Sequence, residues 1–128
     1  MWESHAVIRY LAKKYGLGSL YPKNPQRAAI SDQWMTWSTD SFMGTFFPVF
    51  WQLVRTEEKD RDYIKIAEMA KQSSDILKVL DDHLVNNNFV AGSKFTFGDI
   101  PLGVLIHKYF VLDIERPSLP GIEAWYKR

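Results

Sequence analysis

The chain has 128 residues, enough for one domain with a single hydrophobic core and too few for two ordinary domains. Its formal net charge of +1 argues against a nucleic-acid partner held mainly through phosphates, because such binding needs a clustered basic surface. The absence of cysteine rules out disulfides, thiol catalysis and thiolate metal sites within these residues, and it fits a reducing, cytoplasmic location.

The first predicted element is a short amphipathic helix over residues 3–15. Its apolar residues recur at helical spacing, at Ala6, Val7, Tyr10 and Leu11. Lys13 and Lys14 fall in the last turn and Gly16 follows, as is typical of a helix C-terminus. Residues 16–26 contain two glycines and two prolines, so we expect an extended connector there.

A long second helix is predicted over residues 25–55, with one stripe formed by Ile30, Trp34, Trp37 and Ser41. Because Pro48 lacks a backbone donor, we expect a bend between Gly44 and Pro48. The longest uncharged run, residues 41–54, is shorter than the roughly 20 residues that a membrane-spanning helix needs. The N-terminus carries no secretory signal, and we therefore expect a soluble protein.

A third helix is predicted over residues 61–85, after a polar loop. Its buried stripe follows alternating steps of three and four residues: Tyr63, Ile66, Ala70, Ser73, Leu77, Leu80 and Leu84. Charged residues lie off this stripe, which indicates a solvent-exposed opposite face. Three asparagines at positions 86–88 end the helix, since asparagine favours turns.

The fourth predicted helix, over residues 95–113, is apolar on every side, and we expect other helices to surround it. At its start, the Thr96 hydroxyl is expected to accept from the Asp99 amide while the Asp99 carboxylate accepts from the Thr96 amide. A last helix begins at Gly121 and directs Ile122, Trp125 and Tyr126 inward. No strand or repeat is evident, so the fold class is all-α, a helical bundle of about five elements.

Few residues look catalytic. The three histidines, His5, His83 and His107, are far apart and lack metal-ligand spacing, so we expect structural or surface roles and no metal site. The run from Asp81 to His83 is interpreted as a solvated face, because adjacent helical residues point in different directions. Asp99 is interpreted as a cap and not as a general base.

Glu3 and Ser4 are the one pair of residues whose side chains match the chemistry of a particular kind of ligand. A serine at a helix start can bind an anion with its hydroxyl and the free backbone amides, and the helix dipole favours negative charge there. A neighbouring carboxylate can bind an ammonium group. The pair would suit the α-carboxylate and α-amino group of a free amino-acid end, such as the γ-glutamyl end of glutathione; the alternative is that Ser4 only caps the helix and Glu3 is simply exposed.

Several segments together resemble cytosolic glutathione transferases of the bacterial, theta-like type. WESHAVIRYLAKKYG is similar to the last helix of their thioredoxin-like domain, in which Glu-Ser is followed by Ala, an aliphatic pair and Tyr-Leu. LYPKNP, DQWMTW and FWQLVRTEEKDRD resemble the start of the helical domain. FTFGDI resembles the cap of its buried helix, and LPGIEAWYKR resembles its C-terminal segment.

This resemblance implies an all-α C-terminal domain at residues 27–128, a linker at 17–26 and a remnant thioredoxin-like helix at 1–16. It implies glutathione as co-substrate, a small hydrophobic electrophile, and a homodimer joined partly through the helices that contain Glu3 and Trp34. Glu3 and Ser4 would bind glutathione. Ser38, Phe42 and Thr45 are predicted to line the substrate pocket, with a core role as the alternative, and Asp40 is predicted to reach glutathione across the dimer.

The family's thiol-activating residue and glutathione-binding strands would lie in a thioredoxin-like domain that is largely missing here. We therefore expect a fragment, and we expect no turnover from these 128 residues alone. The alternative function is a non-catalytic helical interaction domain of the same type. Glu3 and Ser4 favour the transferase, since a docking domain has no need of a helix start suited to an amino acid.

Overall fold

A computed structural model describes all 128 residues of the chain, and every regular element in it is helical. The elements are α1 (Ser4–Tyr15), α2 (Pro25–Trp37), η1 (Ser38–Met43), α3 (Gly44–Val54), η2 (Glu58–Asp60), α4 (Tyr63–Val85), α5 (Asp99–Val111) and α6 (Pro120–Tyr126). Only two isolated β-bridges occur, Leu17 with Tyr21 and Phe89 with Gly92. No helix combines the length and the apolar character needed to cross a membrane.

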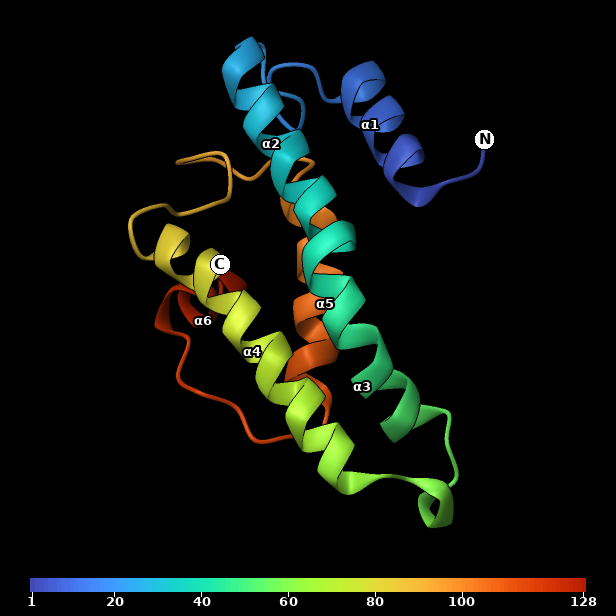
Figure 1. Cartoon of the computed structure of the whole chain (residues 1–128). Coiled ribbons are helices and arrows are strands. Elements are labelled where there is room, and N and C mark those ends of the chain that lie inside the picture. Colours follow the sequence, from blue (N-terminus) through green and yellow to red (C-terminus); the bar gives the residue numbers. More distant parts are fainter.

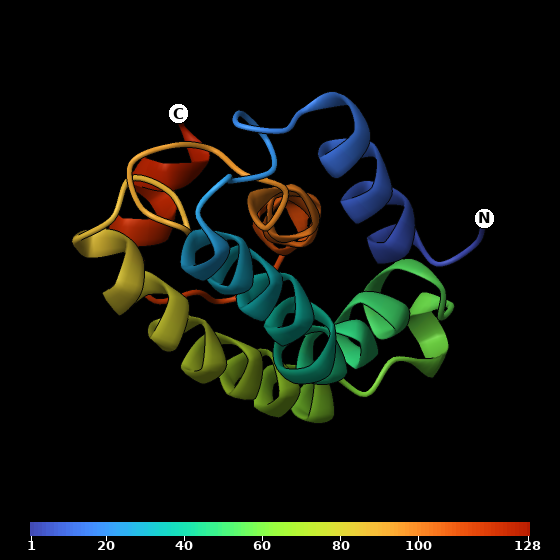
Figure 2. The same cartoon turned by 90° about the horizontal axis from the view of Figure 1, so that it is seen from above.

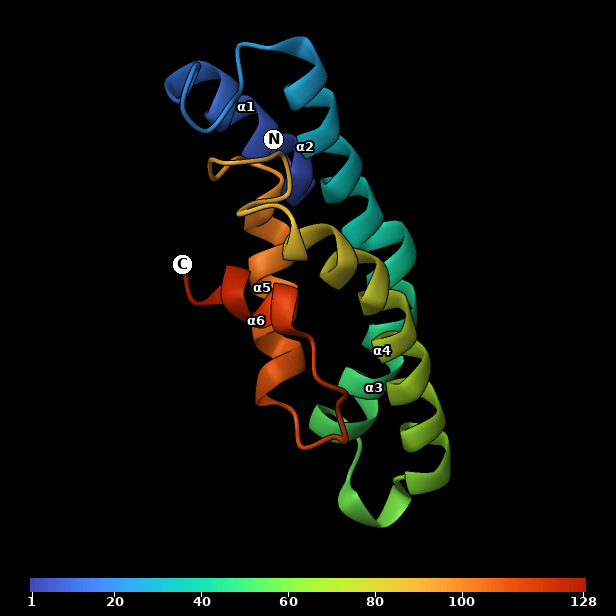
Figure 3. The same ribbon diagram turned by 90° about the vertical axis from the view of Figure 1, so that its left-hand side faces the viewer.

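The helices form two layers around one main core. The rod α2–η1–α3 and the long helix α4 run side by side (Figure 1), and α5 and α6 lie on one side of them (Figure 3). Viewed from above, α5 is seen end-on with α1 on one side and α6 on the other (Figure 2). The fold is therefore the predicted all-α bundle, with α5 near its middle.

Helix α4 confirms the predicted stripe. Asp62 caps it by accepting from the amide of Lys65 at 3.0 Å. All predicted inward residues of the stripe are buried except Tyr63, which lies in the first turn and is exposed. The stripe was predictable because it depends only on a regular apolar period over many turns.

The long second helix is irregular earlier than expected. Residues Ser38–Met43 form a π-helical segment, so the helix geometry already changes before Gly44 and Pro48, and the bend between those two residues stays a prediction. Pro48 lies inside α3. The Ser38 hydroxyl donates to the Met35 carbonyl at 2.6 Å, and the Thr39 hydroxyl donates to Thr36 at 3.0 Å. Such bonds compete with the backbone hydrogen bonds of the helix. They therefore favour bending and π-type turns in this segment.

The start of α5 confirms one half of the predicted cap. The Asp99 carboxylate accepts from the Thr96 amide at 2.9 Å. The Thr96 hydroxyl, however, donates to the same carboxylate at 3.2 Å and accepts from Ser31 on α2 at 3.0 Å. Residues 97 and 98 form a turn, so the helix begins at Asp99 and not directly after Thr96. The hydroxyl thus joins α5 to α2.

Asp99 also holds two distant parts of the chain together. The bonds to Thr96 use Asp99 Oδ2. The other oxygen, Oδ1, accepts from the Val90 amide at 3.0 Å and from the Trp125 indole nitrogen at 2.9 Å. All of these groups are buried. The carboxylate therefore ties the loop before α5, the start of α5 and helix α6 into one buried network.

Helix α5 is not covered on every side, so that expectation is wrong in part. Leu102, Ile106 and Tyr109 are fully buried, but Val104 is 53% exposed and Val111 is 65% exposed. An apolar residue can lie on any face of a helix, and the pattern alone does not say which faces have neighbours. Which face of α5 stays uncovered is decided by how the other helices pack around it.

The run from Asp81 to His83 is not a solvated face. Asp81 is buried, and its carboxylate accepts from the Ile122 amide at 2.8 Å, which supplies an acceptor for the uncapped start of α6. His83 bonds to the Val90 carbonyl at 2.9 Å, and its ring lies 4.8 Å from that of Trp34. Only Asp82 is exposed. The sequence pattern does not indicate this burial, because the partners of Asp81 and His83 lie far away in the chain or in a loop.

Candidate functional site

The N-terminus of α1 carries the predicted Glu3 and Ser4 pair. Glu3 is the N-cap residue and makes no capping bond with its side chain, and Ser4 is the first helical residue. Both side chains are exposed. The amides of the first turn therefore remain available to a ligand, and Ser4 is not the cap that the alternative interpretation required.

Glu3 has a strained backbone. With φ of 68° and ψ of 106°, it is the only residue other than glycine with a positive φ. For a residue with a Cβ atom, such a conformation costs on the order of 1–3 kcal/mol, and strain of this kind concentrates at ligand-binding sites. The strain turns the chain sharply into α1 and presents Glu3 and Ser4 together at the helix start.

Charged groups surround the first turns of α1. His5 is half-buried, and burial followed by the Arg9 guanidinium lowers the pKa of His5 below its usual 6.5. Three carboxylates oppose this shift: Asp32, Asp40 and Glu3. Asp40 of η1 thus lies close enough to influence the first turn of α1 in the same chain. Negative charge beside a helix start with free amides suits a ligand that carries both charges.

Helix α1 packs with a different face from the one its sequence suggested. Tyr10 and Leu11 of the predicted stripe are 45% and 46% exposed. Ala12 is buried instead, in a small cluster with Met35 of α2 and Phe97. The helix is short and its apolar residues cover more than one face, so only its neighbours decide which face is buried.

The predicted pocket residues lie mainly inside the core. Ser38 and Phe42 are fully buried, and Thr45 is half-buried. The Phe42 ring stacks on Phe46 at a centroid distance of 5.2 Å, and the Thr45 hydroxyl donates to the Phe42 carbonyl at 3.0 Å. Ser38 and Phe42 lie on η1 and Thr45 lies on α3, and the burial of the first two fits the core role that was the alternative. A pocket role stays a prediction.

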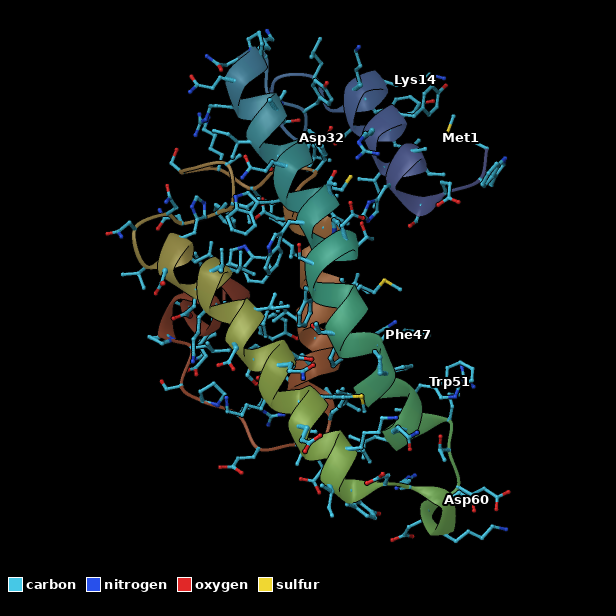
Figure 4. All side chains as sticks on the ribbon, viewed as in Figure 1. Met1, Lys14, Asp32, Phe47, Trp51 and Asp60 are labelled. Atoms are coloured by element: carbon cyan, nitrogen blue, oxygen red, sulfur yellow. The ribbon has the colours of Figure 1, made fainter.

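An exposed, mainly aromatic stripe on α3 and the last residue of η1 is not among the predictions from the sequence. It consists of Met43, Phe47, Trp51 and Val54. Phe47 and Trp51 are 44% and 52% exposed, and their ring centroids are 5.8 Å apart. Both project on the side of the molecule where Met1 also lies (Figure 4). Their four-residue spacing, on the face opposite Phe46 and Val49, was a signal that could have revealed the stripe.

A cavity of about 720 Å³ lies elsewhere, between α4 and residues 113–117. Its basic side chains are already engaged. Lys71 and Lys78 both bind Asp75, and Arg116 donates to the Tyr109 and Leu112 carbonyls at the end of α5. It contains no predicted site residue, so its size alone does not make it the functional site.

The remaining histidines have structural contacts. His107 bonds to the Tyr126 hydroxyl at 2.6 Å and stacks against its ring. His83 has the contacts described above. No group of three or more His, Asp or Glu side chains is arranged to hold a metal ion.

The sequence and fold are similar to known proteins. The family profile described as glutathione S-transferase, C-terminal domain, matches residues 41–128. Glutathione S-transferase GstB of Escherichia coli strain K12 is 30% identical over 128 residues, which are 100% of this chain and 62% of that protein.

Solved structures agree with this. A theta class glutathione S-transferase from Xanthomonas axonopodis pv. citri, with glutathione bound, is 44% identical with a TM-score of 0.93, covering 99% of this chain and 66% of that one. Glutathione transferase BmGSTD1 from Bombyx mori is 30% identical with a TM-score of 0.83, covering 99% and 57%. The chain therefore spans about two thirds or less of these relatives. Because the family profile covers more than half of it, the chain belongs to the glutathione S-transferase family and contains the C-terminal domain of that family.

Proposed function

We propose that the chain is part of a glutathione transferase, in which glutathione thiolate is conjugated to electrophilic substrates, and that Glu3 and Ser4 bind the γ-glutamyl end of glutathione. The observation that carries this proposal is the uncapped start of α1 with its strained Glu3. Family membership and the glutathione-bound relative from Xanthomonas support it.

The γ-glutamyl end carries an α-carboxylate and an α-ammonium group. The carboxylate would accept from the Ser4 hydroxyl and from the free amides of the first turn of α1, where the helix dipole favours an anion. The ammonium would donate to the Glu3 carboxylate, and Asp40 would add negative charge nearby. In this arrangement each charge of the ligand meets a group of the opposite sign.

The electrophile would lie against the apolar side of the same region. Of the predicted wall residues, Thr45 keeps an accessible surface, whereas Ser38 and Phe42 would support the wall from the core. Phe47 and Trp51 would supply the exposed apolar surface for a small hydrophobic substrate. The proposal assigns no residue of this chain to thiol activation. It includes a homodimer as the assembly.

The test is a glutathione titration followed by the backbone amide signals of the chain in NMR. We expect weak binding, with a Kd on the order of millimolar, and shifts concentrated at Ser4, His5 and Ala6. Ser4→Ala should raise the Kd at least about tenfold, because one hydrogen bond to a charged group contributes about 1.5–3 kcal/mol and each 1.4 kcal/mol is a factor of about ten.

Ser118→Ala is the matched control, since Ser118 is an exposed serine on the loop between α5 and α6. Its Kd should equal that of the wild type. An unchanged Kd in Ser4→Ala would remove Ser4 from the site. A wild type whose α1 amides do not respond to glutathione would instead favour the non-catalytic interaction domain, for which the exposed apolar residues Tyr10, Leu11, Phe47 and Trp51 would be the contact surface.

A further inference from the structure

Helix α1 is attached to the rest of the chain by few contacts. Arg9 Nε donates to Asp32 Oδ1 on α2 at 2.5 Å, and this is the only side-chain hydrogen bond that joins α1 to the helical domain. The other attachment is the cluster of Ala12, Met35 and Phe97, with Ile8 at its edge. Figure 4 shows Asp32 on the side of α2 that faces α1.

The two attachments lie at different distances from the helix start. At a rise of 1.5 Å per residue, Ala12 is about 12 Å along the helix from Ser4, and Arg9 is about 7.5 Å from it. If the helix were held at Ala12 alone, a tilt of about 5° would move Ser4 by about 1 Å over that length. The ion pair lies nearer to Ser4 than Ala12 does, beside Ile8 at the edge of the cluster, so it adds a polar restraint on this tilt.

We propose that the Arg9–Asp32 ion pair positions the glutathione-binding start of α1 on the helical domain. The inference rests on the function proposed above. Arg9 and Asp32 act as positioning residues: they do not bind the γ-glutamyl group, and they hold Glu3 and Ser4 where α2 and η1 supply the surrounding charges. A displacement of about 1 Å at a binding group is enough to reduce its effect strongly.

The pair contributes little to folding as a whole. The side chains of Arg9 and Asp32 are 37% and 49% exposed, and exposed ion pairs are weak because water screens them. Loss of the pair should therefore leave the melting temperature of the domain nearly unchanged. A change in glutathione affinity without a change in melting temperature would separate positioning from a general loss of stability.

The experiment compares Asp32→Asn, Asp32→Glu and wild type in the full chain by amide hydrogen exchange and by NMR titration with glutathione. In Asp32→Asn, the amides of residues 7–11 should exchange about three- to fivefold faster and the Kd should rise by a similar factor, as expected for loss of a weak ion pair. Asp32→Glu keeps the carboxylate and should restore most of both values.

The control is Asp75→Asn, which removes a comparable partly exposed carboxylate that binds Lys71 and Lys78 within α4. This variant should change neither the amide exchange of residues 7–11 nor the Kd for glutathione. Equal exchange and equal Kd in Asp32→Asn and wild type would overturn the positioning role. If wild type does not respond to glutathione, the proposed function fails, and hydrogen exchange still decides by itself whether the pair holds α1.

Discussion

Replacing Asp99 with alanine is expected to lower the free energy of unfolding by about 3–5 kcal/mol, because three buried N–H donors, besides the Thr96 hydroxyl, would lose their acceptor at about 1–3 kcal/mol each. These donors are the amides of Val90 and Thr96 and the indole nitrogen of Trp125. The effect extends beyond the start of α5, since Trp125 belongs to α6. Urea unfolding followed by tryptophan fluorescence would measure it.

Asp99→Asn separates the role of charge from the role of shape. Asparagine keeps the volume and one acceptor oxygen, but its amide nitrogen would face donors, so about half of the alanine effect should remain. Asp113→Ala is the control, because Asp113 is exposed, and it should stay within about 0.5 kcal/mol of wild type. An Asp99→Ala variant as stable as this control would show that the network contributes nothing to folding.

Gly98→Ala is expected to destabilise the chain by about 3 kcal/mol through overpacking. A Cβ atom at Gly98 would lie 2.4 Å from the Ser31 carbonyl oxygen and 2.9 Å from the Ser31 Cα atom. Both are backbone atoms of α2, which cannot rotate away as a side chain could. The turn before α5 would have to separate from α2, and the hydrogen bond between Ser31 and Thr96 would be stretched.

Gly103→Ala provides the matched control within α5. A Cβ atom at Gly103 meets nothing within 4 Å, and alanine in a helix interior is favoured over glycine by about 0.5–1 kcal/mol. The two glycine substitutions should therefore change the free energy of unfolding in opposite directions. If both destabilise by similar amounts, close packing against α2 is not what requires glycine at position 98.

The helices themselves were largely predictable. The stripe of α4 and the start of α2 at Pro25, with the Asn24 side chain accepting from the Arg27 amide at 3.0 Å, depend on residues close together in sequence. Local periodicity and capping chemistry are sufficient for such features. The same holds for the bond between the Asp99 carboxylate and the Thr96 amide.

The candidate site was predictable only in part. Glu3 and Ser4 could be proposed because a helix start has known chemistry, but the strain at Glu3 and the charges of Asp32 and Asp40 near His5 come from how α1 meets α2 and η1. The pocket prediction selected Ser38 and Phe42 on the buried side of the helix. The face of Phe47 and Trp51 is the exposed one.

By itself, the sequence determined the helical segments, the buried stripe of α4 and the chemistry available at Glu3 and Ser4. Only the tertiary structure decided that α1 buries Ala12 and exposes Leu11, that Asp81 accepts from the Ile122 amide of α6, and that Asp99 accepts from Trp125. The physical reason is that a periodic pattern identifies the apolar faces of a helix without naming the neighbour that covers them. A polar side chain, likewise, takes its partner from whichever distant segment the packing brings within hydrogen-bond distance.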